Sequence, residues 1–161
     1  MLMKMVNYNE MKSIKISRCL EATISTLVFR LKRDGVATSY VDRLVVELLR
    51  RDDSFASLLV SLLFDGVSKD VVSERIMTMI ATDAVVEDDT PECALRALCD
   101  SLHSEVDSSV LSSAHVLHRA LRDRTTATQK IFAERGVGAQ QLAELMCQLA
   151  AGEYNDKNIV G

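Results

Sequence analysis

The sequence of 161 residues contains no tryptophan, one proline, six glycines, three tyrosines and four phenylalanines. So little proline and glycine leaves few of the turn signals that hairpins and sheets need. Because aromatic residues are scarce, the core must be formed by aliphatic side chains, methionine and alanine, which suits helices that meet along long stripes. The composition therefore favours an all-α fold.

The chain also lacks an excess of basic residues and any long apolar run. Its net charge of −4, with both signs interspersed, argues against a nucleic-acid-binding protein, which needs a concentrated basic face. No stretch approaches the ~20 apolar residues of a membrane span, and the apolar residues 1–6 are too few for a signal peptide. We expect a cytoplasmic protein with neither nucleic acid nor membrane as a partner.

Metal-binding motifs are absent as well. The four cysteines and three histidines are Cys19, Cys93, Cys99, Cys147, His103, His115 and His118. No two cysteines form a CxxC pair, and the histidines do not supply the matched spacing of a zinc site. All four cysteines fall on helical patterns beside leucine and alanine, so we expect buried free thiols and no cofactor.

What is present is a series of apolar stripes with helical period. The clearest comprises Val41, Leu44, Val45, Leu48 and Leu49, at positions i, i+3, i+4, i+7 and i+8. Residues typical of helix ends separate the stripes. Predicted starts are Ser54, Ser68, Thr90-Pro91, Ser112 and Thr125, and predicted ends are Gly35, Gly66 and Gly136. The acidic segment 83–89 carries no stripe and is predicted to be a linker.

The second half of the chain repeats the pattern of the first. "VELLRRDDS" is followed by "FDGV", and "HRALRDRTT" is followed by "ERGV". Such self-similarity indicates a duplicated structural unit. We predict about eight helices in two pseudo-symmetric four-helix repeats that form one domain. The expected divisions are an N-terminal extension (1–12), repeat 1 (13–82), a linker (83–90), repeat 2 (91–151) and a C-terminal tether (152–161).

Four segments carry a resemblance to a known family. They are "SYVDRLVVELLRRDDS", "LRALCDSLHSEVDSSVLSSAH", "LSSAHVLHRALRDRT" and "FAERGVGAQQLAELM". Over roughly residues 13–151 the chain resembles the N-terminal domain of the Clp ATPases, the ring-shaped AAA+ unfoldases and disaggregases. His115 stands where that family has its His-Leu-Leu segment, and Arg43 stands there in the first copy. The resemblance implies a pseudo-twofold pair of four-helix repeats.

The resemblance also implies a function in recognition. In that family the domain recruits a protein substrate, an adaptor or a peptide signal to the AAA+ ring through an apolar groove. The groove lies beside the first helix of the second repeat and the loop after it. The corresponding residues here are Leu98, Leu102, Val110 and His115. Because Leu98 and Leu102 stand at helical spacing, the alternative is that both belong to the core.

The methionine-rich N-terminal segment is a second candidate. In the branch that recycles type VI secretion sheaths, an additional N-terminal helix helps to form the groove for a sheath peptide. Met5 and Met11 would take that part here, because methionine-rich faces adapt to varied partners. The alternatives are that this segment packs on the surface of its own domain or frays.

Catalytic motifs are missing. The sequence has no G-x-x-x-x-G-K-[ST] phosphate loop. Ser113, His115 and Asp123 are available for a Ser/His reading, but their spacing does not indicate a triad, and we expect His115 to form a hydrogen bond at a helix start. The prediction is a non-enzymatic module, monomeric in isolation, that is either the amino-terminal piece of a Clp-type ATPase or free-standing. The rival prediction is a stand-alone accessory subunit that docks on a Clp ring and regulates its assembly.

Overall fold

The computed structural model describes residues 15–83, 85–106 and 110–150. Within this part of the chain there are eight α-helices and two strands of two residues each, which confirms the predicted all-α class. In chain order the elements are β1 (Lys15–Ile16), α2 (Arg18–Asp34), α3 (Tyr40–Arg50), α4 (Phe55–Leu63), α5 (Lys69–Asp83), α6 (Pro91–Glu105), β2 (Val110–Leu111), α7 (Ser113–Arg122), α8 (Ala127–Glu134) and α9 (Ala139–Ala150). None of the described helices is long and apolar enough to cross a membrane.

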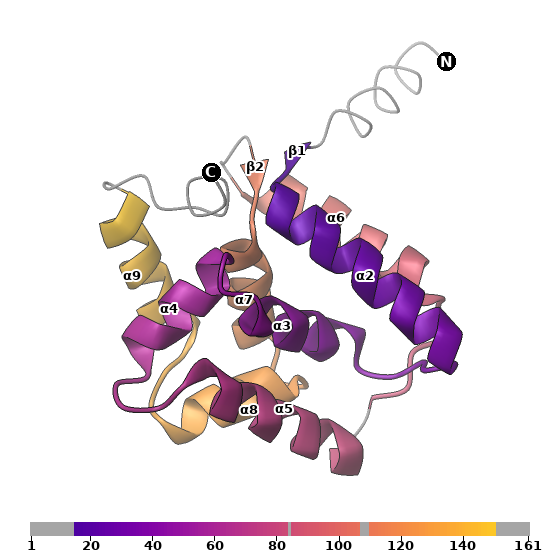
Figure 1. Cartoon of the computed structure of the whole chain (residues 1–161). Coiled ribbons are helices and arrows are strands. Elements are labelled where there is room, and N and C mark those ends of the chain that lie inside the picture. Colours follow the sequence, from indigo (N-terminus) through magenta and orange to yellow (C-terminus); the bar gives the residue numbers. More distant parts are fainter. Residues whose placement is uncertain (1–14, 84, 107–109, 151–161) are drawn as a thin grey trace.

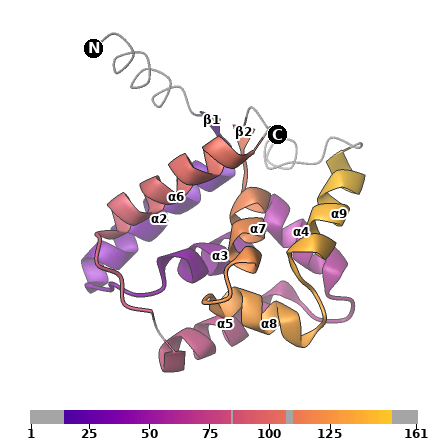
Figure 2. The same ribbon diagram turned by 180° about the vertical axis from the view of Figure 1, so that it is seen from behind.

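Helices α3 and α7 lie at the centre of the molecule and contact each other. Most of the α3 side chains are buried, because its apolar stripe is covered from more than one direction. Helices α2 and α6 pack side by side over one side of this pair, and α5 and α8 pack together on the opposite side (Figures 1 and 2). Helix α9 contacts α4 and α7. Strands β1 and β2 pair in parallel, with Lys15 opposite Val110 and Ile16 opposite Leu111.

The helix ends follow the predicted chemistry at most positions. Gly35 ends α2 in the left-handed conformation with φ +67°, which a residue without a Cβ adopts at little cost, and its N–H donates to carbonyls of the last turn. Thr90 caps α6 and Pro91 begins it, as predicted. Ser68 accepts a hydrogen bond from the N–H of Val71 at 3.3 Å. These local signals therefore placed the helix boundaries correctly.

The starts of α4 and α8 share one capping arrangement. In both, the capping hydroxyl donates to the carbonyl six residues earlier and accepts from the N–H three residues later. These distances are 2.6 and 3.1 Å for Ser54, and 2.7 and 3.1 Å for Thr126. The prediction that Thr125 opens the helix was wrong by one residue, because the Thr125 hydroxyl bonds Asp123 instead, at 2.6 Å.

Each of these two starts also receives a side chain from the other half of the chain. Asp42 on α3 accepts from the N–H groups of Ala127 and Thr128, both at 2.9 Å, and from the Thr128 hydroxyl at 2.7 Å. Ser113 on α7 accepts from the N–H of Ala56 at 3.0 Å. The first N–H groups of a helix lack intrahelical partners, so these contacts satisfy them. The two halves are therefore joined reciprocally, at α8 by Asp42 and at α4 by Ser113.

The segment between α5 and α6 differs in detail from the predicted linker. Helix α5 continues to Asp83, one residue into the expected linker, and the chain then pairs with the loop after α2 through an antiparallel bridge between Thr38 and Val86. The tandem repeat stays a prediction. The order of the helices is compatible with it, since α2–α5 and α6–α9 form two sets of four. The predicted extension (1–12) and tether (152–161) lie outside the described residues.

Candidate functional site

The predicted groove residues occupy two different environments. Leu98 retains 8% and Leu102 1% of its exposure, so both lie in the core, which is the alternative stated for them above. Val110 on β2 and His115 in the first turn of α7 are half-buried. Met5 and Met11 lie outside the described residues. Among the described residues of the predicted groove, Val110 and His115 are therefore the two that are partly exposed to solvent.

His115 has a defined structural partner. Its Nδ1 accepts a hydrogen bond from the backbone N–H of Ser112 at 3.0 Å, which closes a capping box at the start of α7. This confirms the expected hydrogen bond at a helix start. Because Nδ1 accepts, the neutral ring carries its proton on Nε2. The rest of the ring remains half-buried beside β2.

The Ser/His/Asp reading has no geometric support. Ser113 is fully buried and its hydroxyl accepts from the N–H of Ala56. Asp123 follows the last residue of α7, at the opposite end of this helix from His115, and accepts from the backbone and hydroxyl of Thr125. Each of the three side chains serves a separate helix end, so they do not assemble a triad in this structure.

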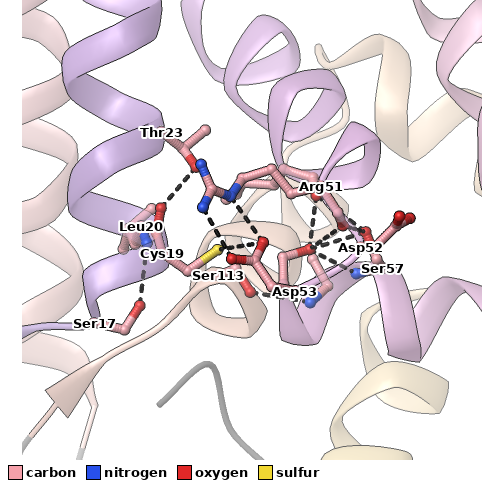
Figure 3. A network of polar contacts seen from close by, with 12 residues as sticks. Ser17, Cys19, Leu20, Thr23, Arg51, Asp52, Asp53, Ser57 and Ser113 are labelled. Carbon is pink, nitrogen blue, oxygen red and sulfur yellow. Dashed lines mark hydrogen bonds and ion pairs between the residues drawn. The ribbon is translucent and has the colours of Figure 1, made fainter. Parts of the chain in front are cut away.

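A polar network joins the loop between α3 and α4 to the start of α2. The guanidinium of Arg51 donates two hydrogen bonds to the carboxylate of Asp53, both at 2.9 Å, and the Cys19 thiol lies 3.9 Å from the same carboxylate. In Figure 3 these three side chains point toward one another. The guanidinium lowers the pKa of Asp53 below its usual value. The approach of Cys19, 34 residues earlier in the chain than Asp53, depends on tertiary packing.

A second charged cluster connects the end of α6 with α7. Glu105 accepts from Arg119 at 3.2 Å and from Arg122 at 2.7 Å, and the bond from Arg122 is the main reason that its pKa is lowered. Burial, followed by the charge of Arg122, lowers the pKa of His118. Both arginines thus pair with the single carboxylate of Glu105, which ties the end of α6 to α7.

The cysteines divide into two classes. Cys19 and Cys99 are buried, as predicted, and burial raises the pKa of the Cys99 thiol to about 11. The expectation of burial was wrong for Cys93 and Cys147, which are exposed because they face away from the buried sides of α6 and α9. In the part of the chain that the structure describes, no group of three His, Cys, Asp or Glu residues could hold a metal ion.

We expect this difference in exposure to control thiol reactivity. Under native conditions at neutral pH, Cys93 and Cys147 should react with a maleimide, because their thiols reach solvent. Cys19 and Cys99 should react at least about a hundredfold more slowly, because labelling requires transient opening of the core. Peptide mapping by mass spectrometry after timed labelling measures this, and unfolding in urea should equalise the four rates. Fast native labelling of Cys99 would contradict the described packing.

Comparisons with protein-family models, with curated proteins and with solved structures return no match for this chain. The functional argument therefore depends on the residues and contacts described above.

Proposed function

We propose that this chain is a non-catalytic recognition domain that recruits a protein substrate or an adaptor to a Clp-type AAA+ unfoldase. The sheath-disassembly ATPases of type VI secretion are the more specific form of the proposal, in which the ligand is a sheath peptide. The ring belongs either to the same chain or to a partner chain. Binding requires no cofactor.

The observation that carries the proposal is the similar capping of the starts of α4 and α8, by Ser54 and Thr126. The same hydroxyl geometry recurs at both, and each helix start is bonded by a side chain of the other half, Asp42 or Ser113. Reciprocal capping of this kind is compatible with the two four-helix units that the Clp resemblance implies, and it supports the proposal in this sense. The sequence repeats and the contacts thus point in the same direction.

Because Leu98 and Leu102 of α6 are buried, we place the proposed binding surface on the remaining described residues of the predicted groove. In the proposal, the ligand contacts the half-buried Val110 and His115 at the end of the domain where β1 and β2 pair. A ligand with two or three apolar anchors suits such a surface, either as a helix or as an extended strand.

The test is a comparison of three baits in pull-downs from native lysate of the source organism, analysed by mass spectrometry. The baits are the unchanged chain, Val110→Ser and the control Val71→Ser, which removes an exposed valine of α5 at the opposite side of the fold. Loss of one contact side chain that costs about 1–2 kcal/mol weakens binding roughly 5- to 30-fold. We therefore expect a cargo or adaptor protein that Val110→Ser recovers at least fivefold less and Val71→Ser recovers equally.

The other outcomes decide between the alternatives. Recovery of Clp ring subunits without cargo favours the accessory subunit. Equal recovery of the cargo by all three baits places its site elsewhere and overturns the role of Val110. Circular dichroism of each bait excludes loss of fold as the cause of lost binding.

A further inference from the structure

A short ribbon joins the two halves at the end of α2. Residues 85–87 pair antiparallel with residues 37–39, with Thr38 opposite Val86. This segment is independent of the proposed groove, because it lies between α5 and α6 rather than after α6. It is one of the few places among the described residues where the backbone is extended rather than helical.

The hydrogen bonds of the ribbon leave one edge open. Ser39 donates its N–H to the carbonyl of Val85 at 2.8 Å, and Glu87 donates its N–H to the carbonyl of Ala37 at 2.9 Å. Because backbone groups alternate in direction along a strand, the N–H and C=O of Val86 point to the other edge. Neither group has a hydrogen-bond partner among the described residues. A partner strand would find both groups available.

The edge is held in place. Ser39 adopts the left-handed conformation, with φ +50°, which few non-glycine residues occupy. In this conformation it bonds Val85 twice, because its hydroxyl also accepts the N–H of Val85, at 3.1 Å. Tyr40 anchors the far end of the segment, since its hydroxyl donates to the carbonyl of Asp89 at 3.0 Å. The backbone of Val86 is therefore presented by neighbours that are fixed on both sides.

The side chains at this edge are apolar and unusually exposed. Val86 keeps 74% of its surface and Val85 keeps 44%. Folded proteins protect open edges with charged side chains, especially lysine, with proline, with bulges or with very short strands, because an unpaired strand with apolar side chains invites another strand. Lysine and proline are both absent from residues 85–89. The two exposed valines would offer apolar contact to a strand added at this edge.

The segment that carries the edge is negatively charged. Asp83, Glu87, Asp88 and Asp89 carry it, and residues 83–90 contain no lysine or arginine. The nearby Arg43 is already engaged, since its guanidinium donates to the carbonyl and hydroxyl of Thr38. Arg43 keeps its positive charge, because both of these acceptors are neutral, but the four carboxylates outnumber it. An incoming strand with positive side chains would therefore meet a net negative charge.

We propose that residues 85–87 form a docking edge for an extended basic segment of a partner protein. The segment adds as a strand at Val86, and its lysines or arginines face Glu87 and the neighbouring aspartates. This is recognition by strand addition, in which main-chain hydrogen bonds supply the affinity and alternate side chains supply the specificity. A second copy of this chain is not the occupant, because two such edges would bring like charges opposite each other.

The test uses a defined probe on the ¹⁵N-labelled full chain. The probe is the capped peptide acetyl-Lys-Val-Lys-Val-Lys-amide, with acetyl-Glu-Val-Glu-Val-Glu-amide as the control of opposite charge. We expect the basic peptide to shift the amide resonances of residues 85–88 in a saturable manner that weakens as salt is raised. The acidic peptide should produce no such shifts at the same concentrations.

Two further changes separate strand addition from simple charge attraction. Proline at position 86 (Val86→Pro) removes an N–H that the fold does not use, and should weaken binding at least tenfold, whereas Val86→Thr keeps the N–H and should change it less than threefold. A basic peptide that is N-methylated at both valines should lose binding to the unchanged chain to the same degree. Equal binding of the methylated peptide, or shifts centred outside residues 83–90, would overturn the proposal. Concentration-dependent dimerisation that Val86→Pro removes would assign the edge to a second copy instead.

Discussion

Replacing Asp42 with alanine is expected to lower the free energy of unfolding by about 3–5 kcal/mol, because three buried donors lose their acceptor at once. The donors are the N–H groups of Ala127 and Thr128 and the Thr128 hydroxyl, all within 2.9 Å of the carboxylate. Asp42 and Thr128 are almost completely buried, so water cannot replace the missing oxygens. The carboxylate also lies at the N-terminus of α8, where the helix dipole favours negative charge.

Urea unfolding followed by circular dichroism measures this loss. Asp42→Asn retains one acceptor oxygen and should cost less, about 1–2 kcal/mol. The matched control is Asp65→Ala at an exposed position, which should remain within about 0.5 kcal/mol of the unchanged chain. A loss below about 1 kcal/mol for Asp42→Ala would mean that the start of α8 finds other acceptors. The reciprocal bracing of the two halves would then be weaker than the distances imply.

Replacing Phe132 with alanine is expected to cost about 3–5 kcal/mol, the range of large-to-small substitutions at fully buried aromatic positions. Phe132 on α8 has no exposed surface and packs edge to face against Phe64, with ring centroids 4.7 Å apart. Its removal would leave a cavity beside Phe64 and remove the ring contact itself.

The same unfolding experiment provides the control. Phe29→Ala deletes an identical side chain from α2, but that ring is 67% exposed and points away from the core. We expect a change within about 0.5 kcal/mol for Phe29→Ala, and a loss of roughly 1–2 kcal/mol for Phe132→Leu, which retains most of the volume. Similar losses for Phe29→Ala and Phe132→Ala would contradict the burial described for both rings.

Most of the helical architecture could be predicted from local patterns. The stripe that includes Leu44, Leu48 and Leu49 became the buried face of α3, because helical period and burial are tied by geometry. The signals at Thr90 and Gly35 worked for the same reason, since capping involves residues that are neighbours in the chain. The error at Thr125 arose because two adjacent threonines compete for the cap, and only the approach of the Ala120 carbonyl selects Thr126.

The candidate site was predicted less completely. The sequence could name Leu98 and Leu102 as groove or core, but their exposure depends on how α6 meets its neighbours. The exposed Cys93 shows the same limit, because a cysteine beside apolar residues in the sequence still faces outward when the helix turns. No sequence pattern predicted the open edge at Val86, because this edge results from pairing with Thr38, 48 positions earlier in the chain.

The all-α class, most of the helix ends and the absence of a phosphate loop could be inferred from the sequence alone, because these follow from residue type and spacing within a few turns of the chain. The tertiary structure alone decided which polar residues join the two halves. Asp42 reads as an ordinary charge in the first turn of α3, yet it caps a helix 85 residues later. A buried carboxylate is tolerated only where donors converge on it, and that convergence is a property of packing rather than of local sequence.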